Sequence, residues 1–157
     1  ILREDKRYTN VYEFKDILAR AMGGRIAESI VNGDDGITTG AGSDLRKATE
    51  IARDMVIEQG MGKKLRDQVF HEDNGGLMFD KMTRDRPYAD DTAKLIDEEV
   101  AALITEAKER AMIVLKANKK FLDKLADALL EHETLEEGAV DEILTGTVLP
   151  KEATLHA

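Results

Sequence analysis

The chain has 157 residues, of which 32 are acidic and 23 are basic, giving a formal net charge of −9. This length suits one domain with one core. Mixing basic with acidic side chains argues against a nucleic-acid-binding protein, which concentrates positive charge. The absence of cysteine excludes disulfide bonds and cysteine-ligated zinc. The longest apolar runs, such as residues 100–104, are far shorter than the ~20 residues of a membrane-spanning helix.

The composition favours helices. Aromatic residues make up only 4% of the chain and tryptophan is absent, so the core must consist of aliphatic side chains and methionine. Packed helices bury such side chains more readily than a β-sandwich does. The only prolines, Pro87 and Pro150, leave long stretches free to be helical. The sequence therefore predicts an all-α fold, mainly helical, with at most one small β-hairpin.

The first predicted helix begins at Asn10. Asn10 and Glu13 have the spacing of a capping box, in which each side chain accepts a hydrogen bond from the other residue's backbone N–H. Apolar residues at spacings of three and four extend the helix to about residue 31. Gly23 and Gly24 lie inside it and cost about 2 kcal/mol relative to alanine. We therefore expect another backbone to pack close to this glycine pair.

A glycine-rich loop, residues 32–42, precedes a second predicted helix over residues 43–59, with Gly60 as its stop. Residues 61–88 are less regular. Within them, residues 68–70 and 77–79 flank a turn signal at 74–75 and are the candidate hairpin. The sequence therefore predicts an irregular segment between the second helix and the helices that follow residue 88.

The last part of the chain reads as a helical hairpin with a short closing helix. Helices are predicted over about residues 90–117 and 119–132, with a short one ending at residue 144. The acidic run of Asp97, Glu98 and Glu99 is expected to face solvent. Residues 145–157 are weakly patterned, and we expect this tail to be frayed.

Motifs of self-contained hydrolytic sites are absent. The three histidines are His71, His132 and His156, and no two are four residues apart, so the chain has no HExxH motif. It also has no G-x-S-x-G motif and no P-loop. No catalytic residue is therefore assigned in this chain.

Two carboxylates remain as candidates. Asp44 follows the glycine-rich loop in the first turn of a helix, where the helix dipole stabilises negative charge and the side chain could reach a metal. Acidic residues are common in first turns, so an ordinary helix-start residue is the alternative. Glu28 lies next to the buried stripe of the first helix and is either a surface residue, a partner of Arg25, or a group that needs a metal or another partner.

Several ordered segments resemble FtsH-type AAA+ zinc metalloproteases. Residues 37–56, ITTGAGSDLRKATEIARDMV, resemble the TTGAxxD signature of that family and the helix after it, and residues 22–28, MGGRIAE, resemble its GGRxAE element. Residues 60–61, 96–100 and 126–135 resemble later landmarks of the same peptidase domain. The resemblance covers about residues 4–145. It implies that residues 1–88 are part of the zinc-peptidase core, 89–145 its C-terminal helical hairpin or bundle, and 146–157 a tail.

The resemblance assigns roles to specific residues. Asp44 matches the aspartate that completes a zinc site begun by the two histidines of HExxH. Glu28 falls in the GGRxAE element and is expected to orient one of the histidine ligands. The glycines and the threonine expected to shape the backbone near the site are Gly23, Gly24, Thr39 and Gly40. The HExxH helix of the family precedes GGRxAE, and we expect this chain to be a fragment that is inactive by itself.

For the parent protein, the resemblance implies an ATP-dependent zinc endopeptidase that degrades unfolded membrane and cytosolic proteins. Zinc would be the metal of the peptidase site, and the AAA+ module would use ATP and magnesium. The parent is expected to be a homo-hexamer, anchored in a membrane by segments outside this chain, with this domain in the cytoplasm or an organelle equivalent and itself soluble. The alternative is a non-catalytic pseudoprotease, an oligomerisation or interaction module.

Overall fold

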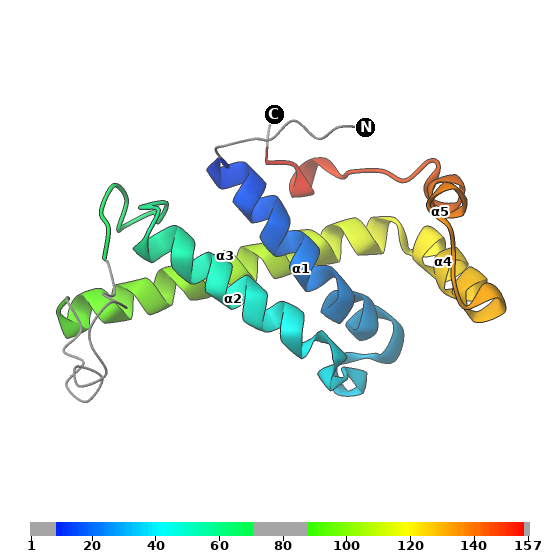
Figure 1. Ribbon diagram of the computed structural model, residues 1–157, viewed down its shortest axis with the longest axis horizontal. Helices are drawn as coiled ribbons and strands as arrows, with labels where there is room; N and C mark the ends of the chain where they lie inside the picture. Colours follow the sequence, from blue (N-terminus) through cyan, green and yellow to red (C-terminus); the bar gives the residue numbers. More distant parts are fainter. Residues whose placement is uncertain (1–8, 71–87, 156–157) are drawn as a thin grey trace.

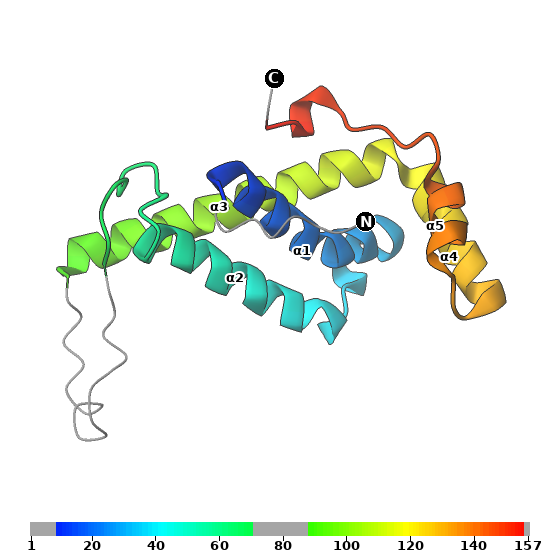
Figure 2. The same cartoon turned by 45° about the horizontal axis from the view of Figure 1, so that its top comes forward.

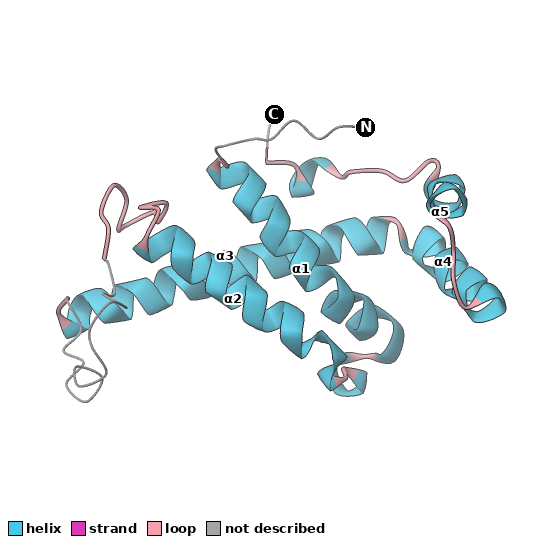
Figure 3. Ribbon diagram, viewed as in Figure 1, coloured by secondary structure: helices cyan, strands magenta, loops and turns pink. Residues whose placement is uncertain are grey.

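The computed structural model describes residues 9–70 and 88–155. Within these residues the chain is helical and forms no strand (Figure 3), which confirms the predicted all-α class. Residues 68–70 of the candidate hairpin lie in no strand, and residues 77–79 are outside the described part. The helices are α1 (Val11–Asn32), η1 (Asp34–Gly36), η2 (Thr39–Ala41), α2 (Gly42–Ile57), α3 (Asp90–Ala117), α4 (Lys119–His132), α5 (Glu137–Leu144) and η4 (Lys151–Ala153), where η marks a 3-10 helix.

Helices α1 and α2 lie side by side, and both cross α3, the longest helix (Figures 1 and 2). The most extensive packing is between α1 and α3, and α2 contacts both. Helices α4 and α5 pack on each other at the C-terminal end of α3. None of the described helices is both long enough and apolar enough to cross a membrane.

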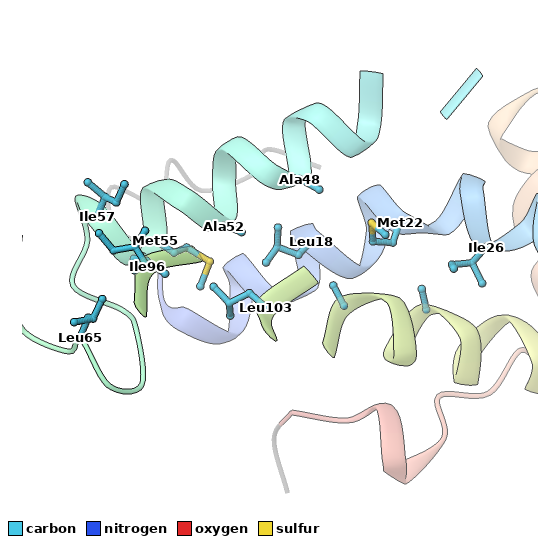
Figure 4. Packing of buried hydrophobic residues seen from close by; sticks show 13 residues of the cluster. Leu18, Met22, Ile26, Ala48, Ala52, Met55, Ile57, Leu65, Ile96 and Leu103 are labelled. Carbon is cyan, nitrogen blue, oxygen red and sulfur yellow. The ribbon is translucent and has the colours of Figure 1, made fainter. Parts of the chain in front are cut away.

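The core lies where α1, α2 and α3 meet (Figure 4). Each of the three helices contributes side chains at helical spacing, as the apolar stripes predict. The central members are Leu18, Met22 and Ile26 of α1, Ala48, Ala52 and Met55 of α2, and Ile96, Leu103 and Ala107 of α3. Small alanines on α2 let that helix approach its neighbours closely. The loop between α1 and α2 is consequently held between two helices that the core fixes in place.

The predicted start of α1 is confirmed. The Glu13 backbone N–H donates to Asn10 Oδ1 at 3.0 Å, and the Asn10 N–H donates to Glu13 Oε2 at 3.3 Å. Polar contacts between side chains also join α1 to α3, because Lys15 Nζ lies 2.6 Å from Glu106 Oε1. The capping box therefore determines where α1 begins, and packing in the core determines how α1 is oriented against α2 and α3.

The expectation that Glu99 faces solvent is wrong. Its side chain is on the packed side of α3 and the residue is only 7% exposed. Its carboxylate accepts hydrogen bonds from the backbone N–H groups of Lys63, Lys64 and Leu65, in the loop that follows α2. These bonds compensate for taking the carboxylate out of water. Glu99 thus joins the α2–α3 connection to α3.

The tail is not frayed over its described residues. Ala153 is 1% exposed, and its carbonyl oxygen accepts a hydrogen bond from Arg110 Nε at 3.1 Å. Asn118 binds the backbone of Val148 in both directions, with Nδ2 donating at 2.7 Å and Oδ1 accepting at 2.8 Å. The spacing of apolar residues does not indicate these polar contacts. They hold the tail against α3 and against Asn118, the residue at its C-terminal end.

Candidate functional site

The site is built around the loop that joins α1 to α2. Gly33 ends α1 with a φ of +76°, a left-handed conformation that favours glycine, and its N–H donates to the Ser29 carbonyl at 3.0 Å. Two short 3-10 helices, η1 and η2, follow. The second, η2, leads without a break into α2. The chain therefore turns back sharply and delivers the first turn of α2 beside the end of α1.

Glu28 of α1 binds this loop through Thr38. The Thr38 backbone N–H donates to Glu28 Oε2 at 2.9 Å, and the Thr38 hydroxyl donates to Glu28 Oε1 at 2.9 Å. The same hydroxyl oxygen accepts the Gly40 N–H at 3.2 Å, which caps η2. One threonine thus connects the carboxylate on α1 to the turn that begins α2.

The electrostatics of Glu28 follow from these bonds. The backbone N–H of Thr38, and then its hydroxyl, stabilise the charged carboxylate and hold the pKa of Glu28 below its ordinary value of 4.5. Desolvation opposes this effect, and the positive charge of Arg25 adds to it. Arg25, which the sequence offered as an alternative partner, is therefore the lesser contributor, and Glu28 is ionised at neutral pH.

Asp44 lies in the first turn of α2, as predicted. The residue is half-buried, and its carboxylate makes no hydrogen bond or ion pair with another described side chain or backbone group. The N-terminal end of the α2 dipole stabilises its negative charge. A half-buried carboxylate with free lone pairs at the end of a fixed helix is suited to bind a cation.

The described residues do not complete a metal site. Among residues 9–70 and 88–155, no group of three or more histidine, aspartate or glutamate side chains is placed to hold a metal ion. Of the described histidines there is only His132, in α4, far along the chain from the α1–α2 loop. Any metal held at Asp44 would need ligands beyond those that the described residues supply.

The glycines differ from their expected roles. A Cβ built on Gly23 or Gly24 would meet nothing within 4 Å, so the described chain places no backbone close to this pair, contrary to our expectation. A Cβ on Gly40 would lie 3.2 Å from Thr38 Oγ1 and 3.8 Å from Glu28 Oε1. Gly40 therefore leaves room for the Glu28–Thr38 contact. Gly23 and Gly24, in contrast, lie on a part of the α1 surface where a side chain would meet no described atom within 4 Å.

Sequence reasoning missed Thr38. It singled out Thr39, whose exposed side chain lies in η2, and Gly40. The overlooked signal was a threonine two residues before a glycine at the start of a helical turn, which is a preferred capping position. The sequence left open whether Glu28 is a surface residue, a partner of Arg25 or a group that needs a metal or another partner, and no pattern in it identified Thr38 as the partner.

Comparison with known proteins identifies the family of this chain. A model of peptidase family M41 matches residues 2–143. This chain is similar to two proteins named ATP-dependent zinc metalloprotease FtsH. The one from Akkermansia muciniphila is 46% identical over 90% of this chain and 17% of its own length. The one from Thermotoga maritima is 38% identical over 90% of this chain and 23% of its own length. A third with that name, from Chloroflexus aggregans, is 42% identical over 85% of this chain and 21% of its own length.

The family match assigns this helical fold to a peptidase domain, in which Asp44 stands at the start of α2. The chain belongs to peptidase family M41, because the family model covers most of its length. It spans about a fifth of the length of the curated relatives it matches.

Proposed function

We propose that this chain is part of an ATP-dependent zinc metalloendopeptidase and that Asp44 is one of its zinc ligands. The observation that carries the proposal is the half-buried Asp44 carboxylate, which has no partner among the described residues and lies at the start of a helix fixed by the core. Its position in the TTGAxxD-like segment and the membership of family M41 support the same role.

Zinc in a catalytic site takes three protein ligands and leaves one position for water. Two histidines of an HExxH segment outside this chain would supply the other ligands, and Asp44 would complete the set. Zinc held there would supply an activated water, and a glutamate of the HExxH segment would serve as the general base. The work of this chain is to hold the Asp44 carboxylate in a fixed position, and α1, α2 and α3 provide the frame.

The whole protein would use ATP and magnesium in an AAA+ module and would act on unfolded protein substrates. The names of the relatives support both the ATP dependence and the zinc chemistry. We extend the proposal to a homo-hexamer anchored in a membrane by segments outside this chain, with the peptidase domain on the cytoplasmic side. In this arrangement residues 1–88 would contribute to the peptidase core and 89–145 to its helical periphery.

A non-catalytic interaction module is the competing function. Exposed apolar side chains on α4, such as Leu130 at 85%, would suit an interface. The kinship with proteins named as proteases favours the enzyme instead. The two functions differ in one directly readable feature, because only the enzyme requires an HExxH motif in the coding region upstream of Ile1.

The experiment uses the full-length protein encoded by that region, purified with zinc. We expect wild-type protein to retain zinc and to cleave unfolded casein in an ATP-dependent way, and Asp44→Ala to lose both properties. Asp91→Ala is the matched control, because Asp91 is also a first-turn aspartate, at the start of α3, and is exposed. Normal zinc content and cleavage with Asp44→Ala would overturn the ligand assignment.

A further inference from the structure

We propose that Thr38 is a positioning residue for the metal ligand Asp44, and that Glu28 acts on the Asp44-bearing loop through Thr38. This inference rests on the proposed function. It gives Glu28 a different task from the one the resemblance suggested, which was to orient a histidine ligand. It also assigns a role to Thr38, to which neither the motif nor the family name gives one.

The first step of the argument is that the Thr38 hydroxyl is fully committed. It has one hydrogen, which it donates to Glu28 Oε1 at 2.9 Å, while its oxygen accepts the Gly40 N–H at 3.2 Å. A hydroxyl that donates and accepts at once has little rotational freedom. The backbone N–H of Thr38 adds a bond of 2.9 Å to the other oxygen of Glu28. Thr38 is therefore fixed to α1 at two points.

The second step is that Thr38 is rigidly connected to Asp44. Thr38 is the N-cap of η2, and the Gly42 N–H donates to the Thr39 carbonyl, so η2 passes directly into α2. Every residue from 39 to 44 is helical, and Ala41, within this stretch, is only 7% exposed. No flexible residue separates Thr38 from Asp44, because the backbone between them is helical. Holding Thr38 in place therefore also holds the first turn of α2 in place.

The third step concerns Glu28. Both oxygens of its carboxylate accept hydrogen bonds from Thr38, and these bonds are the largest influences on its charge state. Such charge-assisted bonds are stronger than neutral ones. Among the described residues, the carboxylate is thus directed at the loop. Its effect on zinc would be exerted through the placement of Asp44.

Zinc binding is sensitive to such placement. Ligand–zinc distances vary by only ~0.2 Å in well-formed sites, and residues that orient a ligand change metal affinity about 10- to 100-fold when they are removed. Removing the Thr38 hydroxyl would leave η2 and the first turn of α2 less firmly held to α1 without touching the Asp44 side chain. We therefore expect a site that still binds zinc but releases it faster.

The test compares Thr38→Val and Thr38→Ser in the zinc-loaded full-length protein. Valine keeps the shape of threonine without its hydroxyl, whereas serine keeps the hydroxyl. The readout is the rate of zinc release to a chromogenic chelator in excess, together with the thermal midpoint of unfolding. Thr49→Val is the matched control, because the Thr49 hydroxyl binds only the Leu45 carbonyl of its own helix, at 2.9 Å.

We expect Thr38→Val to release zinc about tenfold faster than wild type, while Thr38→Ser and Thr49→Val resemble wild type and all midpoints stay similar. In a Glu28→Gln background, Thr38→Val should have a much smaller effect, because the two residues act as a pair. This pattern would support the positioning role, which a purely structural contribution of Thr38 would not reproduce.

The inference alone would be overturned by zinc release from Thr38→Val at the wild-type rate, or by fully additive effects of the two substitutions. Faster release that accompanies a large drop in the unfolding midpoint would also overturn it, because Thr38 would then act through the fold. A wild-type protein that binds no zinc would be a different failure, since it would overturn the proposed function itself.

Discussion

The loops on either side of α2 are both held by a glutamate from another helix, but in different surroundings. Before α2, Glu28 of α1 binds one backbone N–H and the hydroxyl of Thr38 at a half-buried position. After α2, Glu99 of α3 binds three successive backbone N–H groups and is only 7% exposed. The two arrangements use the same chemistry at different depths.

Depth decides what each glutamate contributes. The bonds that Glu99 accepts are buried or part-buried, so donors that lose this acceptor regain water less easily, and the Glu99 contacts should matter mainly for stability. Donors nearer the surface can exchange a lost partner for water at small cost, so the Glu28 contacts should matter little for stability. Their value lies in where they hold the loop that ends at Asp44. We expect the two glutamates to separate stability from metal binding.

The largest effect is expected for Glu99→Ala. It leaves the backbone N–H groups of residues 63–65 without their acceptor, and we expect the 157-residue chain to lose about 3 kcal/mol of unfolding free energy. Urea unfolding at neutral pH measures this loss. Glu98→Ala is the matched control, because Glu98 is exposed and pairs with Lys64 only at 3.3 Å. Equal losses for the two variants would show that burial of Glu99 is not what matters.

The second prediction concerns the glycine that faces Glu99. A Cβ on Gly62 would clash with Glu99 Oε2, so alanine cannot be accommodated unless the carboxylate leaves its donors. We expect Gly62→Ala to cost about 2 kcal/mol in urea unfolding, the typical penalty for overpacking. Combined with Glu99→Ala, it should add almost nothing, since the clash would be gone. Additive losses would mean that Gly62 serves the backbone and not the carboxylate.

The sequence predicted the fold better than it predicted these contacts. Helix positions follow from apolar spacing and local caps, and the Asn10–Glu13 capping box was found as expected. Glu99 was misassigned because it stands in an acidic run that resembles a solvated face. It lies three residues after Ile96 and four before Leu103, which places it on the buried stripe. The helical spacing alone predicts that Glu99 is buried, but its charge favoured the opposite assignment.

The candidate site could be predicted only in part. Asp44 and Glu28 became candidates because their residue types stand at recognisable places in local motifs, and their roles at a metal site stay predictions. The partner of Glu28 could not be found, because the contact with Thr38 depends on how the loop turns back toward α1. The close packing expected at Gly23 and Gly24 is a similar case, since a glycine indicates available space but not what fills it.

A smaller effect is expected for Gly40→Ala. Its Cβ would lie 3.2 Å from Thr38 Oγ1, so the threonine must shift by a few tenths of an ångström, in contrast to the direct clash at Gly62. At this exposed position we expect a loss within about 0.5 kcal/mol in urea unfolding. A loss as large as that of Gly62→Ala would remove the contrast between the two loops.

The smallest effect is a pH dependence at Glu28, measured as the difference in unfolding midpoint between the wild-type chain and Glu28→Gln from pH 7 to pH 3. The Thr38 bonds hold the pKa of Glu28 in the folded chain below its ordinary value of 4.5. The folded state therefore binds the proton less readily than the unfolded state, and the stabilisation is fully present above pH 4.5 and lost as the pH falls through the lowered pKa. Wild type should be slightly more stable than Glu28→Gln at neutral pH, and the difference should close on acidification.

Other carboxylates titrate in both chains, so their effects cancel in the comparison. A difference that grows as the pH falls would have the wrong sign for a carboxylate stabilised in its charged form, and would show that Glu28 does not hold the loop through Thr38.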